Sequence, residues 1–342
     1  MDSAQLPGLD LDRFADWFAR ACPGQVTGPL TGRLLAGGKS NLTYAVTDGS
    51  RTWVVRRPPL GHVLATAHDM AREHRVITAL RDTGVPVPRT YALCADTTVL
   101  GAPFYVMDLV VGTPYRHAAE LAPLGPERTA AISRRLVETL ATLHRVDPAA
   151  VGLADFGRPE GFLARQVRRW TTQLAASRSR ELAGADELPV LLAEHLPTEQ
   201  PPAIVHGDFR LDNLLVDDQD QVRAVLDWEM ATLGDPLTDV ALMLVYQRLA
   251  TFGPDQVVAD ASAAPGYLSA EETLELYRAG SDRDLSAMGF YLALAYFKLA
   301  VILEGIHYRH VHGQTVGSGF DRVGAVVEPL IAAAITSLKE SR

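Results

Sequence analysis

The chain has 342 residues, of which 47% are hydrophobic, so it is long enough to bury a large core and to form two domains or lobes. Its formal net charge of −9 argues against a nucleic-acid-binding protein, which normally carries a basic stripe. Cys22 and Cys94 form neither a disulfide framework nor a metal-ligand spacing. The N-terminal residues lack the basic region and apolar run of a secretory signal. We therefore expect a cytoplasmic protein with no membrane span and no nucleic-acid partner.

The first part of the chain is predicted to be a helix followed by a small sheet. Apolar residues at helical spacing predict an amphipathic helix over 9–21. Residues 34–58 then follow the pattern of strand, glycine turn, strand, tight turn and strand. The glycine turn is a candidate phosphate-binding loop, because glycines let backbone N–H groups approach a phosphate closely. Its candidate ligand-binding residues are Gly37, Gly38, Ser40 and Asn41.

The same turn has an alternative interpretation, because Gly38-Lys39-Ser40 ends like a Walker A loop. That motif needs a glycine five residues before Gly38, where this chain has Arg33. A Walker A loop must also open a helix, whereas residues 42–46 favour a strand. A glycine-rich hairpin that covers phosphates is the better interpretation.

Further elements are predicted in order along the chain. A helix over 66–80 is broken by Gly84 to Pro88, and strands are expected over 89–94 and from residue 103. From Gly125 onward the pattern is mainly helical. Two later helices have clear signals: Ser269 with Glu272 forms a capping-box pattern, and the apolar run 285–306 predicts a buried helix.

The stretch 204–229 carries the strongest chemical signal. A short apolar strand ends at His206-Gly207-Asp208, Asn213 follows Asp208 by five residues, and a second hairpin strand ends at Asp227. Carboxylate and amide oxygens suit a hard cation such as Mg²⁺, which binds substrate phosphates through its other positions. The spacing matches the phosphoryl-transfer pattern of a base aspartate, an asparagine and a metal-binding aspartate. A solvated acidic hairpin with turn-capping Asp and Asn would need only one of these residues, so we favour the catalytic interpretation.

This stretch resembles the catalytic and metal loops of the aminoglycoside-phosphotransferase-like small-molecule kinases. The HGDxxxxN pattern and the LDWE tetrapeptide stand where protein kinases have HRDxxxxN and DFG, and GGxSN matches the family's phosphate loop. The phrases VVRRPP, REHRVITAL and LDWEMATLGDPLTDVALML resemble the kinase-like domain associated with acyl-CoA dehydrogenases. The resemblance extends over most of residues 30–310. It implies an α+β, protein-kinase-like bilobal fold, with an antiparallel-sheet N-lobe over 1–108 and a larger, mostly helical C-lobe over 109–342.

The resemblance also implies roles for residues on the nucleotide side. Alternation along the third strand puts Arg56 on the same face as Val54, so Arg56 is placed to grip the α- and β-phosphates where the family usually has lysine. Arg57 is the alternative, and we favour Arg56. Glu73 is expected to pair with this cation. Backbone groups of residues 108–110, from Asp108 to Val110, are expected to hydrogen-bond the adenine edge.

The remaining roles concern the transfer itself. Asp208 is the expected base, Asn213 and Asp227 the expected Mg²⁺ ligands, and Asp239 the buried residue that accepts hydrogen bonds from the catalytic-loop backbone. The implied activity is transfer of the γ-phosphoryl group of ATP or GTP to a small-molecule hydroxyl acceptor. The acceptor is a metabolite of hydroxyacyl-CoA type or an antibiotic, and the scarcity of acidic residues near the C-terminus favours the metabolite.

Two other function classes are weighed against this one. A nucleotide-binding module without transfer is supported by the arginine at position 56, while the intact Asp208, Asn213 and Asp227 argue against it. A protein-serine kinase is disfavoured because HGD replaces HRD and no APE-like segment follows Asp227.

Three histidines, His307, His310 and His312, do not form a zinc-binding pattern with a carboxylate. The acceptor, the choice of ATP or GTP and the oligomeric state remain open at this level.

Overall fold

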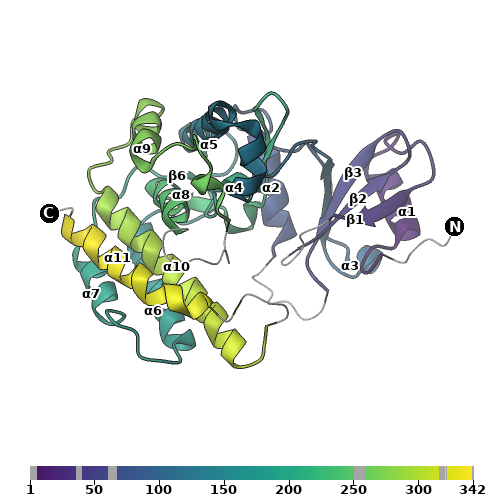
Figure 1. Cartoon of the computed structure of the whole chain (residues 1–342). Helices are drawn as coiled ribbons and strands as arrows, with labels where there is room; N and C mark the ends of the chain where they lie inside the picture. The colour runs from purple at the N-terminus through teal and green to yellow at the C-terminus, as the bar shows by residue number, and fades with distance from the viewer. Residues whose placement is uncertain are drawn as a thin grey trace. The chain divides into compact units, whose positions relative to one another are not determined.

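The computed structural model describes residues 6–35, 41–60, 68–249, 259–315, 320 and 322–340. Gly37, Gly38 and Ser40 of the predicted phosphate loop lie outside the described residues. The chain forms two compact units (Figure 1): unit 1 is Met1–Gly112 with Arg223–Ala231, and unit 2 is Thr113–Val222 with Thr232–Arg342. The sequence placed the boundary after residue 108, and it assigned 223–231 to the C-terminal lobe.

Unit 1 is built on a five-stranded antiparallel sheet of order β1-β2-β3-β5-β4. Its strands are β1 (Thr31–Leu34), β2 (Leu42–Thr47), β3 (Thr52–Arg57), β4 (Thr90–Cys94) and β5 (Phe104–Asp108). β2 and β3 form a full hairpin, from Leu42 opposite Arg57 to Thr47 opposite Thr52. The predicted strand, turn and strand pattern is therefore present in the described part of this region.

An aromatic core fills one side of this sheet. Helix α1 (Leu11–Ala21) starts at Asp10, whose side chain caps it, and buries Phe14 and Phe18 completely. Phe18 lies edge-on to Trp53 of β3, with 5.4 Å between the ring centroids. Aromatic pairs of this kind add to the free energy gained by burying their surface. α3 (Thr97–Leu100) packs against α1.

Helix α2 (Met70–Leu80) packs against β4 and β5 and carries one buried acidic residue, Glu73. The segment Arg223–Ala231 of the same unit contains most of β8 (Val222–Val225) and the 3₁₀ helix η3 (Trp228–Met230). The Val225 amide donates to the Pro86 carbonyl at 2.8 Å, which ties this segment to the chain that follows α2.

Unit 2 is mainly helical. Its elements are α4 (Ala118–Leu121), η1 (Ala122–Leu124), α5 (Pro126–Arg145), α6 (Phe162–Ser177), α7 (Glu187–Glu194), β6 (Ala203–Val205), η2 (Leu211–Asn213), β7 (Leu214–Val216), β9 (Thr232–Gly234), α8 (Leu237–Leu249), η4 (Ala261–Ala263), α9 (Ala270–Ala279), α10 (Met288–Val311), η5 (Val323–Val326) and α11 (Val327–Glu340). β6 and β9 pair antiparallel; β6 leads into residues 206–213, the predicted catalytic loop, and β9 leads into α8.

Helix α10 is the central helix of unit 2, packed against α11, α8 and α6 (Figure 1). Among the described residues it is the one helix long and apolar enough to cross a membrane, yet its most apolar window is 67% buried inside the protein. Burial of that kind is typical of a core helix. The sequence predicted its extent as 285–306, which is wrong at both ends, because α10 begins at Met288 and continues to Val311.

Other sequence predictions can be checked at single residues. The Ser269 capping box is confirmed, since Ser269 and Glu272 exchange hydrogen bonds at the start of α9. Within the described ranges, no group of three or more His, Cys, Asp or Glu side chains is arranged to hold a metal ion. The mixed α+β class is confirmed by the sheet of unit 1 and the helices of unit 2.

Candidate active site

One arginine on the sheet of unit 1 pairs with two carboxylates. Arg56 lies on β3, and its Nε donates to Glu73 Oε2 at 2.8 Å while its Nη2 donates to Asp227 Oδ1 at 2.7 Å. The side chain of Arg56 is 14% exposed and that of Glu73 only 1%. Burial raises the pKa of Glu73, and the Arg56 charge opposes that shift. A planar guanidinium can serve both acids at once, which a lysine ammonium does less well.

The neighbouring arginine has a different environment. Arg57 is buried, and its Nη1 donates to the carbonyls of Gly8 at 2.6 Å and Leu100 at 2.9 Å. These hydrogen bonds tie the Arg57 side chain to two backbone carbonyls within unit 1. Of the two candidates, Arg56 is the one that the structure pairs with Glu73, while the phosphate contact itself stays a prediction.

Glu73 is held by three donors rather than one. Besides Arg56, the Asn41 Nδ2 donates to Glu73 Oε1 at 3.1 Å and the Tyr105 hydroxyl donates to Oε2 at 3.1 Å. Asn41 also donates to Glu229 Oε2 at 3.2 Å and is 1% exposed. Its amide N–H groups, which the sequence suggested for a phosphate, are therefore directed to two carboxylates. Asn41 and Tyr105 thus orient Glu73.

The predicted adenine-binding segment follows β5. The Asp108 amide donates to the Arg89 carbonyl at 2.8 Å, and its Oδ1 accepts a hydrogen bond from the Tyr91 hydroxyl at 2.6 Å. The N–H of Asp108 is therefore engaged within the sheet. Val110 lies beyond the end of β5, and the adenine contact of this segment stays a prediction.

Asp227 adopts an unusual backbone conformation. It follows β8 with φ +65°, in the left-handed region that non-glycine residues rarely occupy. Such strain persists where the surroundings determine the conformation, and it is concentrated at functional sites. Its side chain is 33% exposed, so a carboxylate paired with Arg56 remains accessible to solvent.

The catalytic-loop residues of unit 2 surround Asp208. The Tyr246 hydroxyl of α8 donates to Asp208 Oδ1 at 3.0 Å, and Arg210 Nε lies 3.6 Å from the same oxygen. Asn213 Nδ2 donates to the Asp208 carbonyl at 2.8 Å and to Oδ2 at 3.2 Å. These contacts fix the direction of the carboxylate. They also leave the Oδ1 of Asn213 as a hard oxygen ligand of the kind that Mg²⁺ prefers.

The backbone before Asp208 is held by a buried carboxylate. Asp239 Oδ2 accepts from the His206 amide at 2.6 Å and Oδ1 from the Gly207 amide at 2.7 Å, which confirms the predicted role of Asp239. Although burial opposes it, the hydrogen bond and charge of His144 help to lower the pKa of Asp239. His144 is fixed in turn by the Tyr277 hydroxyl, 2.8 Å from its Nδ1.

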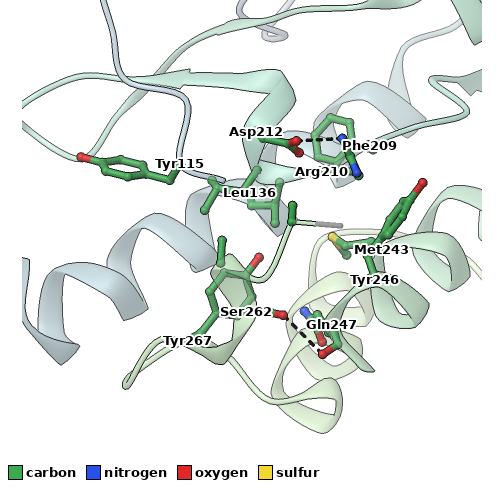
Figure 2. A pocket seen from close by; sticks show the side chains of 13 residues that line it. Tyr115, Leu136, Phe209, Arg210, Asp212, Met243, Tyr246, Gln247, Ser262 and Tyr267 are labelled. Carbon is green, nitrogen blue, oxygen red and sulfur yellow. Dashed lines mark hydrogen bonds and ion pairs between the residues drawn. The ribbon is translucent and has the colours of Figure 1, made fainter. Parts of the chain in front are cut away.

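A small cavity of about 30 Å³ lies beside this loop (Figure 2). Arg210 and Tyr246, which both contact Asp208, form part of its wall, and the Arg210 guanidinium lies over the Tyr246 ring at 4.9 Å. Arg210 also pairs with Asp212 at 2.7 Å. The volume suits a few atoms or ordered water rather than a whole metabolite. The lining residues are Tyr115, Leu136, Phe209, Arg210, Leu211, Asp212, Met243, Tyr246, Gln247, Ala259, Ala261, Ser262 and Tyr267.

Three residues near Asp208 escaped the sequence analysis as functional candidates: Arg210, Tyr246 and Lys298. Arg210 lies inside the HGDFRLDN motif, so its nearness was a usable signal. Tyr246 and Lys298 come from helices α8 and α10, and although Lys298 interrupts an apolar run, nothing local links either residue to Asp208. Lys298 Nζ donates to the Gly207 carbonyl at 2.8 Å.

Comparison with known proteins places this geometry in a family. Residues 31–277 match the model of the phosphotransferase enzyme family. Acyl-CoA dehydrogenase family member 11 of Rattus norvegicus is 36% identical over 310 residues, which cover 89% of this chain and 39% of that protein. Member 10 of Mus musculus is 35% identical, over 89% of this chain and 29% of that protein. The chain thus spans less than two fifths of the length of these relatives.

Solved structures agree with this relationship. A crystal structure from Ralstonia eutropha JMP134, provisionally described as an aminoglycoside phosphotransferase, has a TM-score of 0.85 and 32% identity over 97% of this chain and 98% of that one. The streptomycin–ATP–APH(2″)-IIa ternary complex, at 14% identity and a TM-score of 0.57 over 86% of this chain and 90% of that one, shares the fold. The predicted kinase-like fold and family resemblance are both confirmed. The chain belongs to the phosphotransferase enzyme family.

Proposed function

We propose that the protein is a small-molecule kinase that transfers the γ-phosphoryl group of ATP to the hydroxyl of a metabolite. The observation that carries this proposal is the environment of Asp208, whose two carboxylate oxygens are oriented by Tyr246 and Asn213 on a loop held by Asp239. Phosphoryl transfer depends mainly on positioning and electrostatic stabilisation. A carboxylate fixed in this way is suited to accept the proton of an attacking hydroxyl.

The remaining roles follow from the contacts of each side chain. Asn213 and Asp227 would hold Mg²⁺, which when bound neutralises charge on the phosphates. Each residue by itself suits Mg²⁺: Asn213 in unit 2 offers an amide oxygen and Asp227 in unit 1 a partly exposed carboxylate, and Mg²⁺ with few protein ligands keeps several waters. Arg56 would contact the α- and β-phosphates, with Glu73, Asn41 and Tyr105 fixing its direction.

The acceptor that we propose is a hydroxyacyl-CoA-like metabolite rather than a polycationic antibiotic. One cationic side chain lies beside the proposed base: Arg210 Nε is 3.6 Å from Asp208 Oδ1. A guanidinium at this position favours an anionic group on the acceptor over a cationic one. The names of the relatives, acyl-CoA dehydrogenase family members, support an acyl-CoA connection.

A direct assay tests the proposal. Purified protein is incubated with Mg²⁺ and ATP, then GTP, against hydroxyacyl-CoA species and aminoglycosides, and products are identified by mass spectrometry. We expect a phosphorylated hydroxyacyl-CoA that disappears with Asp208→Asn, while the nucleotide affinity of this variant changes only a few-fold. Efficient phosphorylation of aminoglycosides with no activity on hydroxyacyl-CoA would reverse our choice of acceptor.

A nucleotide-binding module without transfer is a second candidate, and one observation favours it. The contact of 2.7 Å between Arg56 and Asp227 engages a carboxylate that the kinase needs for its metal. If calorimetry shows nucleotide binding but no acceptor is phosphorylated, and Arg56→Lys gains transfer, this second candidate is correct.

A further inference from the structure

Lys298 is an unusual residue for its position in unit 2. It lies in the middle of α10, between the buried residues Phe297 and Leu299, on a helix with a long apolar stretch. Taking a charge out of water costs free energy unless the charge is paired or hydrogen-bonded. A partly buried lysine at such a position therefore needs a specific partner.

The partner is the backbone of the catalytic loop. Lys298 Nζ donates to the Gly207 carbonyl at 2.8 Å, while the Gly207 amide donates to Asp239 at 2.7 Å. Gly207 has φ +86°, a left-handed conformation that other residues rarely adopt. The residue before Asp208 is thus held from both sides, by a carboxylate at its N–H and by an ammonium group at its C=O.

The electrostatic surroundings show why this donor is a charged one. Burial lowers the pKa of Lys298, the charges of Asp208 and Asp239 oppose that shift, and Arg169 on α6 adds to it. The ammonium nitrogen also lies 5.8 Å from the centre of the Trp170 ring, which favours a cation. A cation here acts on two carboxylates, whereas a neutral donor would satisfy only the carbonyl oxygen.

We propose that Lys298 is a positioning residue for phosphoryl transfer, which fixes the direction of Asp208 through the Gly207 carbonyl and balances the charges of Asp208 and Asp239. The proposal rests on the kinase function proposed above, because Asp208 is the base of that reaction. Lys298 lies 91 residues from Gly207 in the sequence, so the contact links the core helix α10 to the catalytic loop.

The test compares three variants on α10. Lys298→Met keeps most of the side-chain volume but removes the donor and the charge. Lys298→Arg keeps both. Glu304→Gln is the matched control, since it removes the charge of another buried residue of the same helix, one that pairs with Arg180 at 2.9 Å.

Two readouts are measured for each variant. For Lys298→Met we expect kcat to fall on the order of 100-fold with the KM for ATP within about threefold, because a small displacement of a reacting group is enough for such a loss. Amide hydrogen exchange in residues 204–209 should become about tenfold faster. Lys298→Arg should recover most of kcat, and Glu304→Gln should change neither readout by more than about twofold. If Lys298→Met folds poorly, Lys298→Leu, which also lacks the donor and the charge, replaces it with the same expectation.

The two readouts separate this proposal from the proposed function. One outcome is that wild-type protein transfers phosphate, Asp208→Asn does not, and Lys298→Met keeps kcat and amide exchange rates within twofold of wild type. That outcome supports the kinase function and refutes the role of Lys298. An equal loss of kcat in Lys298→Met and Glu304→Gln would also refute it, because the effect would then be general destabilisation. If no variant shows transfer, exchange in 204–209 still decides whether Lys298 holds the loop.

Discussion

Replacing Arg56 by methionine should destabilise unit 1, and it should do so in a pH-dependent way. Glu73 is 1% exposed and its Oε2 is 2.8 Å from Arg56 Nε, so the substitution leaves a buried carboxylate without its cation. Asp227 loses its contact of 2.7 Å at the same time. Asn41 and Tyr105 remain as neutral donors to Glu73.

The expected magnitude follows from the burial of the pair. Removing one partner of a buried ion pair typically costs about 3–5 kcal/mol, because the charge left behind is uncompensated. Arg56 is 14% exposed and two neutral donors stay on Glu73, so we expect the lower end, about 3 kcal/mol at pH 8. That loss is a large fraction of the stability of an ordinary domain.

The sign of the pH dependence follows from Glu73. Its pKa in the folded protein is raised by burial, so the folded state binds this proton more tightly than the unfolded state does. The contribution of Glu73 to stability is then fully present below its pKa in the unfolded chain, about 4.3. It is lost as the pH rises through the pKa of Glu73 in the folded protein. Without Arg56 the folded pKa of Glu73 rises further. The difference between wild type and Arg56→Met should therefore be small near pH 5 and grow towards pH 8.

Urea unfolding followed by tryptophan fluorescence measures this difference. Three of the four tryptophans, Trp17, Trp53 and Trp228, belong to unit 1, so fluorescence reports mainly on that unit. The double variant Arg56→Met/Glu73→Gln is the control and should recover at least about 1 kcal/mol, because the uncompensated charge is gone. A loss below about 1 kcal/mol, or one that is equal at pH 5 and pH 8, would show that Glu73 does not depend on the Arg56 charge for its stability.

Two further predictions concern the catalytic loop. Tyr246→Phe removes the hydroxyl that donates to Asp208 Oδ1. In steady-state assays kcat should therefore fall about five- to tenfold with the KM for ATP unchanged. An unchanged kcat would show that this contact is dispensable. Gly207→Ala introduces a side chain at φ +86°, which costs about 1–2 kcal/mol of local strain, so kcat should fall at least about tenfold. The matched control Gly101→Ala, at φ +83° after α3, should lose similar stability and keep kcat, and equal kcat losses in both variants would contradict a local effect.

The parts of the molecule that were predictable from sequence are those with a local cause. The turn between β6 and η2 is set by its own residues, since Gly207 supplies the left-handed conformation and Asn213 bonds back to the Asp208 carbonyl. The helix α9 starts at Ser269 because that side chain caps it. In each case the interacting residues are only a few positions apart, so a short stretch of sequence includes both partners of the hydrogen bond.

The parts that were not predictable depend on distant packing. Lys298 reads in the sequence as an interruption of an apolar helix, and only the fold brings its ammonium to Gly207. The sequence suggests Asn41 as a loop donor for phosphate. In the structure its side-chain amide donates hydrogen bonds to Glu73 and Glu229 instead. The periodicity of a helix or strand shows which face is buried. It does not show which polar atom of another element lies against that face.

The proposed reaction is phosphoryl transfer with Asp208 as the base and Mg²⁺ held by Asn213 and Asp227. The most direct test follows the terminal phosphate of isotope-labelled ATP into a hydroxyacyl-CoA acceptor, with wild type, Asp208→Asn and Asp227→Asn, in Mg²⁺ and in EDTA. We predict labelled acceptor only with wild type in Mg²⁺, with losses of at least about 10³-fold in both variants. Label transferred at the wild-type rate by Asp208→Asn, or undiminished in EDTA, would contradict the proposed roles of Asp208 and Mg²⁺.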